Sequence, residues 1–167
     1  MSKKVRIAGI VRESIVDGPG IRFVVFAQGC PHHCDGCHNP STHDFNGGNL
    51  VAVDAIINEM KKNPLLDGIT LSGGEPFEQP EAFGELAERA RELGYHVMAY
   101  TGYTYEKLLT KKDEQRLRLL ENTDLLVDGK FEMKKKSLLL KFKGSKNQRI
   151  IDVKKSLLLK NTVLSEV

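Results

Sequence analysis

Residues 21–37 read IRFVVFAQGCPHHCDGC. Positions 21–28 are apolar and β-branched, which predicts a buried strand running directly into a cysteine loop. Cys30, Cys34 and Cys37 are the only cysteines of the chain, and their C-x3-C-x2-C spacing brings three thiolates around one loop. A four-iron cluster normally takes four cysteine ligands, so three would leave one iron open to a substrate or cofactor. An incomplete ligand set is typical of a reactive metal site.

Zinc is the alternative metal for this loop. Four of the five histidines lie in the same segment, at His32, His33, His38 and His43. Three cysteines and one histidine are a common structural zinc set, and thiolates suit both zinc and iron–sulfur centres. An odd number of cysteines argues against a disulfide framework. The loop alone therefore leaves two functions open: a cluster enzyme, or a zinc-binding interaction module.

Strand and helix patterns alternate along the rest of the chain. Helical spacing of apolar residues occurs at 53–60 and 83–90, and a third helical stretch covers 105–122. Short strands are predicted at 68–71, 96–100 and 125–127. This alternation predicts an α/β fold with parallel strands and helices packed outside. A complete eight-fold barrel typically needs about 250 residues, so this 167-residue chain, expected to form one domain over 1–167, closes only part of one.

The predicted strand ends share an edge of the sheet. In β/α architectures, functional groups gather at the carboxyl ends of the strands. The cysteine loop follows one strand, and SGGEP (72–76), TGY (101–103) and DGK (128–130) follow the next three. We therefore expect these four loops to face one pocket.

The cysteine loop and four further motifs, in order along the chain, carry a family resemblance. SIVDGPGIRF (14–23), the cysteine loop and ITLSGGEPF (69–77) together resemble the radical S-adenosylmethionine superfamily, in particular the small activating enzymes of glycyl-radical proteins. DLLVDGKFE (124–132) and KFKGSKNQRIIDV (141–153) resemble the branch that activates anaerobic ribonucleoside-triphosphate reductase. The resemblance covers most of the chain, from about Ile15 to Val153. It leaves the structure of 154–167 open.

This resemblance implies a fold, a reaction and partners. The expected fold is an open, partial TIM-like β/α barrel with a mostly parallel sheet, forming a single radical S-adenosylmethionine domain. The expected reaction is reductive cleavage of S-adenosylmethionine at a [4Fe-4S] cluster, giving methionine and a 5′-deoxyadenosyl radical that takes a hydrogen from a glycine of the reductase. A flavodoxin-type protein is the expected electron donor. The alternative within the family is a pyruvate formate-lyase-type activating enzyme, which shares the DGPGIRF start but is usually longer.

The resemblance also assigns roles within the cysteine loop. Cys30, Cys34 and Cys37 would bind three irons, and the fourth iron would take the amino and carboxylate groups of S-adenosylmethionine. Gly36 and His38 match positions that lie against the adenine. His38 is also the alternative fourth metal ligand, since a Cys3His set suits zinc.

The glycine pair after the second strand is the expected methionine site. Gly73 and Gly74 lack Cβ, so backbone can approach a ligand closely there and adopt positive φ. Carbonyls at this strand end, together with the Glu75 carboxylate, are expected to receive the methionine ammonium group. Residues 17–20 form a Gly-Pro-Gly turn, and in the family this segment also lines the partner's access route. Residues 147–149 belong to the family-specific stretch, and no role is assigned to them.

The net charge of +3 conceals an asymmetry. Residues 130–160 carry eleven Lys or Arg against two acidic residues, a net charge of +9, which leaves −6 for the rest of the chain. One interpretation is a face for an acidic partner, and the other is a solvated lysine-rich edge. Only Phe131 and Phe142 accompany the lysines, too few aromatic rings for a nucleic-acid stacking surface. The longest apolar run, 23–27, is too short to cross a bilayer, and the polar start lacks a signal peptide, so a cytoplasmic protein is expected.

Overall fold

A computed structural model of the chain describes residues 3–32, 34, 40–110, 113–137 and 139–166. The strands are β1 (Lys4–Ser14), β2 (Arg22–Ala27), β3 (Asn49–Ala52), β4 (Gly68–Gly73), β5 (His96–Tyr100), β6 (Leu125–Asp128) and β7 (Arg149–Asp152). The helices are α1 (Val53–Lys61), α2 (Pro80–Glu92), α3 (Tyr105–Thr110), α4 (Glu114–Glu121) and α5 (Val153–Leu159). Short 3₁₀ turns lie at Pro40–Thr42, Pro76–Glu78 and Met133–Lys135.

The described strands form one seven-stranded sheet in the order β3-β1-β2-β4-β5-β6-β7. Strands β2, β4, β5 and β6 are parallel neighbours, as the helix–strand alternation predicts. The flanking pairs β1–β2, β1–β3 and β6–β7 are antiparallel, which the sequence analysis does not anticipate. Because β3 and β7 end the sheet without pairing to each other, the α/β fold is an open, partial barrel, as expected.

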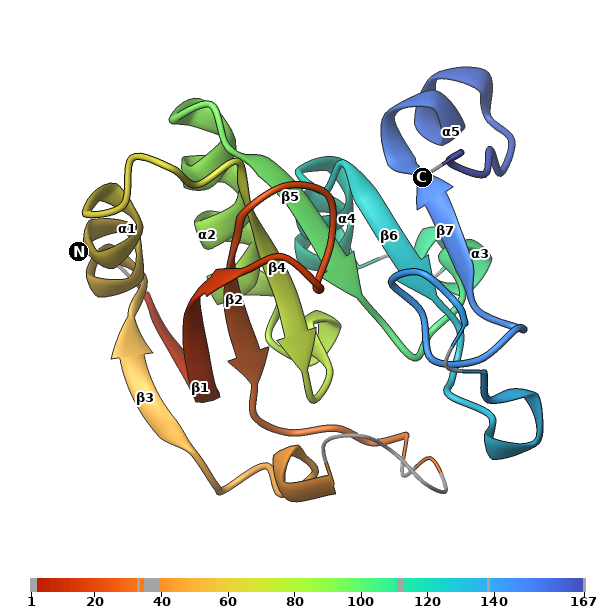
Figure 1. The fold of residues 1–167 in the computed structure, drawn as a ribbon, viewed down its shortest axis with the longest axis horizontal. Helices are drawn as coiled ribbons and strands as arrows, with labels where there is room; N and C mark the ends of the chain where they lie inside the picture. Colours follow the sequence, from red (N-terminus) through yellow and green to blue (C-terminus); the bar gives the residue numbers. More distant parts are fainter. Residues whose placement is uncertain (1–2, 33, 35–39, 111–112, 138, 167) are drawn as a thin grey trace.

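Helices cover one face of the sheet (Figure 1). Helices α1 and α2 confirm the helical patterns at 53–60 and 83–90, and both bury their apolar side in the main core. The stretch predicted as one helix over 105–122 is two helices, α3 and α4. Asp113 begins the second helix, because its carboxylate accepts hydrogen bonds from the backbone N–H groups of Gln115 and Arg116.

The connection between β1 and β2 crosses the opposite face of the sheet (Figure 1). There, the Thr70 hydroxyl donates to the carbonyl of Asp17 over 2.8 Å. The side chain of Arg22 is fully buried beneath this connection, and its guanidinium donates to the Thr70 hydroxyl and to the carbonyls of Pro19 and Ile69. Burial lowers the pKa of Arg22 to about 10. The DGPG turn thus covers the face of the sheet opposite the helices, and the hydrogen bonds of Thr70 and Arg22 hold it there.

Helix α5 begins at Val153, and the residues described after it, 160–166, form no further helix or strand. Asp152 caps the helix by accepting from the backbone N–H of Lys155 over 3.0 Å. Leu164 then forms an antiparallel bridge with Ile151 of β7. Among the described residues, no helix is long and apolar enough to cross a membrane.

Candidate active site

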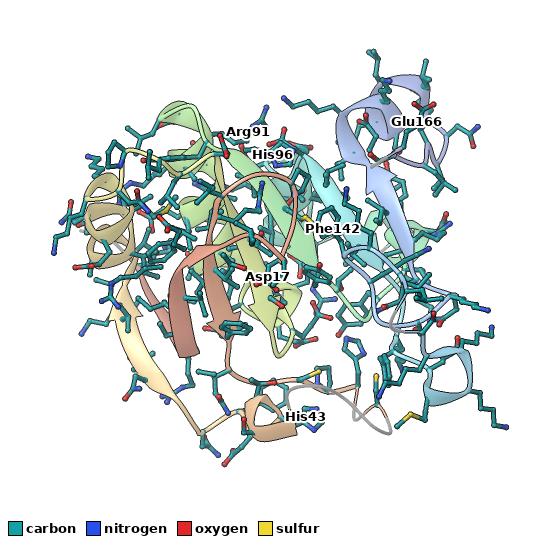
Figure 2. The ribbon with its side chains drawn as sticks, viewed as in Figure 1. Asp17, His43, Arg91, His96, Phe142 and Glu166 are labelled. Atoms are coloured by element: carbon teal, nitrogen blue, oxygen red, sulfur yellow. The ribbon has the colours of Figure 1, made fainter. Side chains whose placement is uncertain are left out.

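A cavity of about 500 Å³ lies at the carboxyl ends of the parallel strands. The register pairs Ala27 of β2 with Gly73 of β4, and Tyr100 of β5 with Val127 of β6, so these strands end at about the same level. Residues of all four predicted loops line the cavity, and so does Asp17 of the DGPG turn, which Figure 2 shows in front of the sheet. The common pocket expected from the sequence is therefore present.

Two of the three cysteines face this cavity. Cys30 is buried and Cys34 is half-buried, and both line the cavity. Cys37, Gly36 and His38 lie outside the described residues, so their predicted roles stay predictions. Within the part of the chain that is described, no three or more His, Cys, Asp or Glu side chains form a metal-binding group. Two thiols on one cavity wall, with a third cysteine three residues after Cys34, fit a cluster with three protein ligands.

Backbone hydrogen bonds hold the two ends of the cysteine loop together. The N–H of Gly29 donates to the carbonyl of Thr42 over 2.6 Å, and that of Cys30 donates to the carbonyl of His43 over 3.2 Å. The buried amide of Gln28 donates to the carbonyls of Ser41 and Asp44. Residues 29–30 and 42–43 thus form a hydrogen-bonded base for the cysteine loop, which fixes the backbone position of Cys30.

The glycine pair packs against this base of the cysteine loop. Gly73 has a φ of 85°, and an added Cβ there would lie 2.6 Å from the backbone N of Ala27. A Cβ at Gly74 would lie 2.5 Å from the carbonyl oxygen of Gly29. Both residues also line the cavity. The glycine pair predicts the close approach of a ligand, and the structure adds the close approach of two backbone segments.

Glu75 is completely buried and is not among the cavity-lining residues. Its carboxylate accepts hydrogen bonds from the Phe77 N–H (3.0 Å), the Thr101 hydroxyl (2.9 Å) and the Gly102 N–H (2.7 Å). Nε2 of His32 lies 2.6 Å from the same carboxylate. A contact between Glu75 and the methionine ammonium stays a prediction, but four protein groups already surround this carboxylate. Sequence reasoning missed this arrangement.

Comparisons with known proteins place this chain in a family. A family model described as a 4Fe-4S single cluster domain matches residues 16–151. An anaerobic ribonucleoside-triphosphate reductase-activating protein of Vibrio cholerae is 35% identical over 144 residues, which cover 81% of this chain and 90% of that protein. The corresponding protein of Escherichia coli is 34% identical over 143 residues, covering 80% of this chain and 90% of that protein. The chain belongs to the anaerobic ribonucleoside-triphosphate reductase-activating proteins.

Two further proteins also match over smaller parts of their chains. A pyruvate formate-lyase-activating enzyme of Clostridium pasteurianum is 38% identical over 117 residues, but these cover only 65% of this chain and 49% of that enzyme. Among solved structures, QueE from Escherichia coli matches with a TM-score of 0.46 and 16% identity over 60% of this chain and 53% of that chain. The 4Fe-4S description of the family model favours an iron–sulfur cluster over zinc at the cysteine loop.

The family-specific stretch of this activating protein builds one wall of the cavity. Phe131, Lys136 and Phe142 line the cavity from the segment between β6 and β7. The hydroxyl of Tyr100 donates to the carbonyl of Phe142 over 2.5 Å, and burial, followed by the nearby charge of Asp17, raises the pKa of that tyrosine. Figure 2 shows Phe142 beside β5 and β6. The wall is thus attached to the strand end.

The amide of Gln148 holds this wall in place. Its oxygen accepts from the N–H groups of Gly144 (2.8 Å) and Ser145 (3.2 Å), and its nitrogen donates to the carbonyl of Gly129 (3.0 Å). The Asn147 amide donates to the carbonyl of Lys130 over 2.8 Å. These two residues, to which the sequence assigns no role, fold the 129–148 segment back onto its own start.

Arg149 fastens the last strand to the same edge. Its guanidinium donates to the buried carboxylate of Asp128 and, over 2.6 Å, to Glu106. Hydrogen bonding to Arg149, together with the Thr162 hydroxyl, lowers the pKa of Glu106 to about 2. Asp128 also accepts from the N–H of Tyr105 over 2.8 Å. This network connects β6, β7 and α3 behind the cavity wall.

Proposed function

We propose that this chain activates anaerobic ribonucleoside-triphosphate reductase by generating a glycyl radical in it. The observation that carries the proposal is the cavity, which Cys30 and Cys34 line together with the strand-end glycines Gly73 and Gly74. Its volume of about 500 Å³ lies in the range of small-molecule sites. When bound, the [4Fe-4S] cluster supplies the electron that cleaves S-adenosylmethionine, so that methionine and 5′-deoxyadenosine form and a glycine of the reductase loses a hydrogen atom.

The residues of the chain bind and orient the two cofactors. Cys30, Cys34 and Cys37 hold three irons and leave the fourth for S-adenosylmethionine. Carbonyls at Gly73 and Gly74 would receive the methionine ammonium group, and the family resemblance assigns Gly36 and His38 to the adenine. Asp17 of the DGPG turn and the 129–148 wall line part of the cavity and limit the access of water to the reacting atoms. A flavodoxin-type protein delivers the electron.

Lysines beside the cavity form the docking face for the reductase. The three lysines at 134–136 are exposed, and Lys136 also lines the cavity. The 130–160 region carries a net charge of +9, which fits an acidic partner surface. Exposed charges are screened beyond about 8 Å at physiological ionic strength, so association should weaken as salt is raised.

Charge reversal tests the docking face. Changing the lysines at 134–136 to Glu should slow glycyl-radical formation on the reductase more than it slows cleavage of S-adenosylmethionine without the reductase. Reversing the exposed lysines Lys4, Lys61 and Lys107 makes the same change in net charge elsewhere and should affect neither rate. Equal slowing of both reactions by the 134–136 variant would remove this face from the docking surface.

Electron paramagnetic resonance tests the function itself. The reduced protein with S-adenosylmethionine should produce a glycyl radical on the reductase and none on pyruvate formate-lyase. A radical on pyruvate formate-lyase alone would show that the chain is the other kind of activating enzyme.

A further inference from the structure

His32 lies between two of the cysteines, and its ring is turned into the protein. Its side chain is 5% exposed, that of Glu75 is 0% exposed, and Nε2 of His32 lies 2.6 Å from Oε1 of Glu75. Resting on the proposed function, we propose that His32 and Glu75 form a latch that positions the cysteine loop over the ends of β4 and β5. Both are positioning residues, because they act on the cofactors through the loop.

The Glu75 end of the latch is rigid. Its carboxylate is fixed by the N–H groups of Phe77 and Gly102 and by the hydroxyl of Thr101. The Thr101 hydroxyl in turn accepts from the N–H of Tyr103 over 3.1 Å. The loops after β4 and β5 are thereby joined at one buried point, and a buried carboxylate is stabilised only where such donors surround it.

Gly102 and Tyr103 leave a closely fitting space for the ring of His32. A Cβ added at Gly102 would lie 2.3 Å from Cδ2 of the ring, so the glycine is needed for the ring to lie there. The rings of Tyr103 and His32 pack edge to face, with centroids 4.6 Å apart and planes at 77°. Tyr103 is held by Glu78 through its hydroxyl and by Arg116, which lies 4.9 Å above its ring. The ring of His32 therefore has one position.

This position matters because His32 is two residues from each neighbouring cysteine. A fixed ring restricts the backbone at Cys30 and Cys34, and with it the position of both thiols in the cavity that Gly73 and Gly74 also line. The cluster is held by the thiols, whereas the methionine end of S-adenosylmethionine is expected at the glycines. Reacting groups must be held to within about 0.5 Å of their productive geometry. The latch would therefore set the distance between the cluster and the methionine end of S-adenosylmethionine. Because Nε2 of His32 is already hydrogen-bonded to Glu75, we assign this histidine a positioning role and not the role of a zinc ligand.

Three variants test the latch. His32→Leu keeps the size of the side chain and removes the donor, while His32→Gln restores an N–H at the reach of Nε2. Tyr103→Phe keeps the ring beside His32 and loses only the hydroxyl that Glu78 holds, so it should weaken the latch less than His32→Leu does. The readouts are hydrogen exchange at the amide of Cys30 in the metal-free protein, and the change that S-adenosylmethionine causes in the electron paramagnetic resonance spectrum of the reduced cluster.

In His32→Leu, exchange at Cys30 should rise by about tenfold to a hundredfold, the factor carried by one hydrogen bond to a charged group. Its dissociation constant for S-adenosylmethionine, read from the spectral change, should rise at least tenfold, and His32→Gln should recover most of both effects. If His32→Leu takes up no iron, recovery of iron by His32→Gln supports the latch, and no recovery overturns it. Wild-type exchange and a wild-type spectral change in His32→Leu also overturn it. Failure of the proposed function would appear instead in the wild type, as absence of a radical on the reductase.

Discussion

The cavity wall between β6 and β7 should open when Gln148 is changed to Ala. Its amide makes three hydrogen bonds, to Gly144, Ser145 and Gly129, and all three are part-buried. A neutral hydrogen bond contributes about 0.5–1.5 kcal/mol net, so the variant should lose about 1.5–4.5 kcal/mol of local stability. At about 1.4 kcal/mol per factor of ten, the open population of the wall rises by about tenfold to a thousandfold.

Hydrogen exchange measures this opening directly. The amides of Gly144 and Ser145 should exchange faster in Gln148→Ala by that factor, while amides of β4 stay protected. Because the wall lines one side of the cavity and adjoins the proposed docking face, glycyl-radical formation on the reductase should fall more than the binding of S-adenosylmethionine. Lys146→Ala is the control, since Lys146 is exposed and lies in the same turn. Unchanged exchange at Gly144 in Gln148→Ala would refute the clamp.

Two further predictions concern the buried polar groups of the half-barrel. Arg22→Met should lower the free energy of unfolding by about 2–4 kcal/mol in urea titrations, because it leaves buried acceptors without a donor. Arg12→Met is the control: it breaks an exposed ion pair with Glu59 and should change the free energy of unfolding by less than about 1 kcal/mol. Equal effects of the two variants would contradict the buried role of Arg22. Burial, followed by the charge of Arg22, lowers the pKa of His96, so the unfolded state binds the proton more readily. The stability that neutral His96 contributes should therefore be fully present above a pH of about 6.5 and be lost as the pH falls through the pKa of the folded protein. Between pH 7.5 and 5.5, His96→Gln should lose less free energy of unfolding than the wild type. An equal loss in both proteins would contradict this prediction.

Local patterns predicted the centre of the fold and missed its edges. Strands β2, β4, β5 and β6 are buried apolar runs bounded by turn residues, and their order along the chain fixes parallel pairing. Strand β1 carries Arg6 and Arg12, and one side of it is partly exposed, so no continuous apolar pattern marks it. Strand β3 has only four residues and forms by pairing with residues 4–7, far away in the sequence. Such contacts leave no local signal.

The candidate site shows the same division. The cysteines and strand-end glycines follow from spacing and from their place after predicted strands. The contact between His32 and Glu75 joins residues 43 positions apart, and it exists only once β2, β4 and β5 lie side by side. Gly102 was the available signal, since a glycine in a loop after a strand marks close approach of another group. Gln148 gave none, because an exposed-looking amide in a lysine-rich stretch resembles any surface residue.

The central claim is that the cysteine loop holds a reactive four-iron cluster rather than zinc. Metal and sulfide analysis of anaerobically purified and reconstituted protein, followed by reduction with S-adenosylmethionine and assay of 5′-deoxyadenosine, tests it most directly. The account predicts about four irons and four sulfides per chain, formation of 5′-deoxyadenosine, and loss of that product in Cys30→Ala, Cys34→Ala and Cys37→Ala. Stoichiometric zinc without iron, or an iron-loaded protein that leaves S-adenosylmethionine intact, would contradict it.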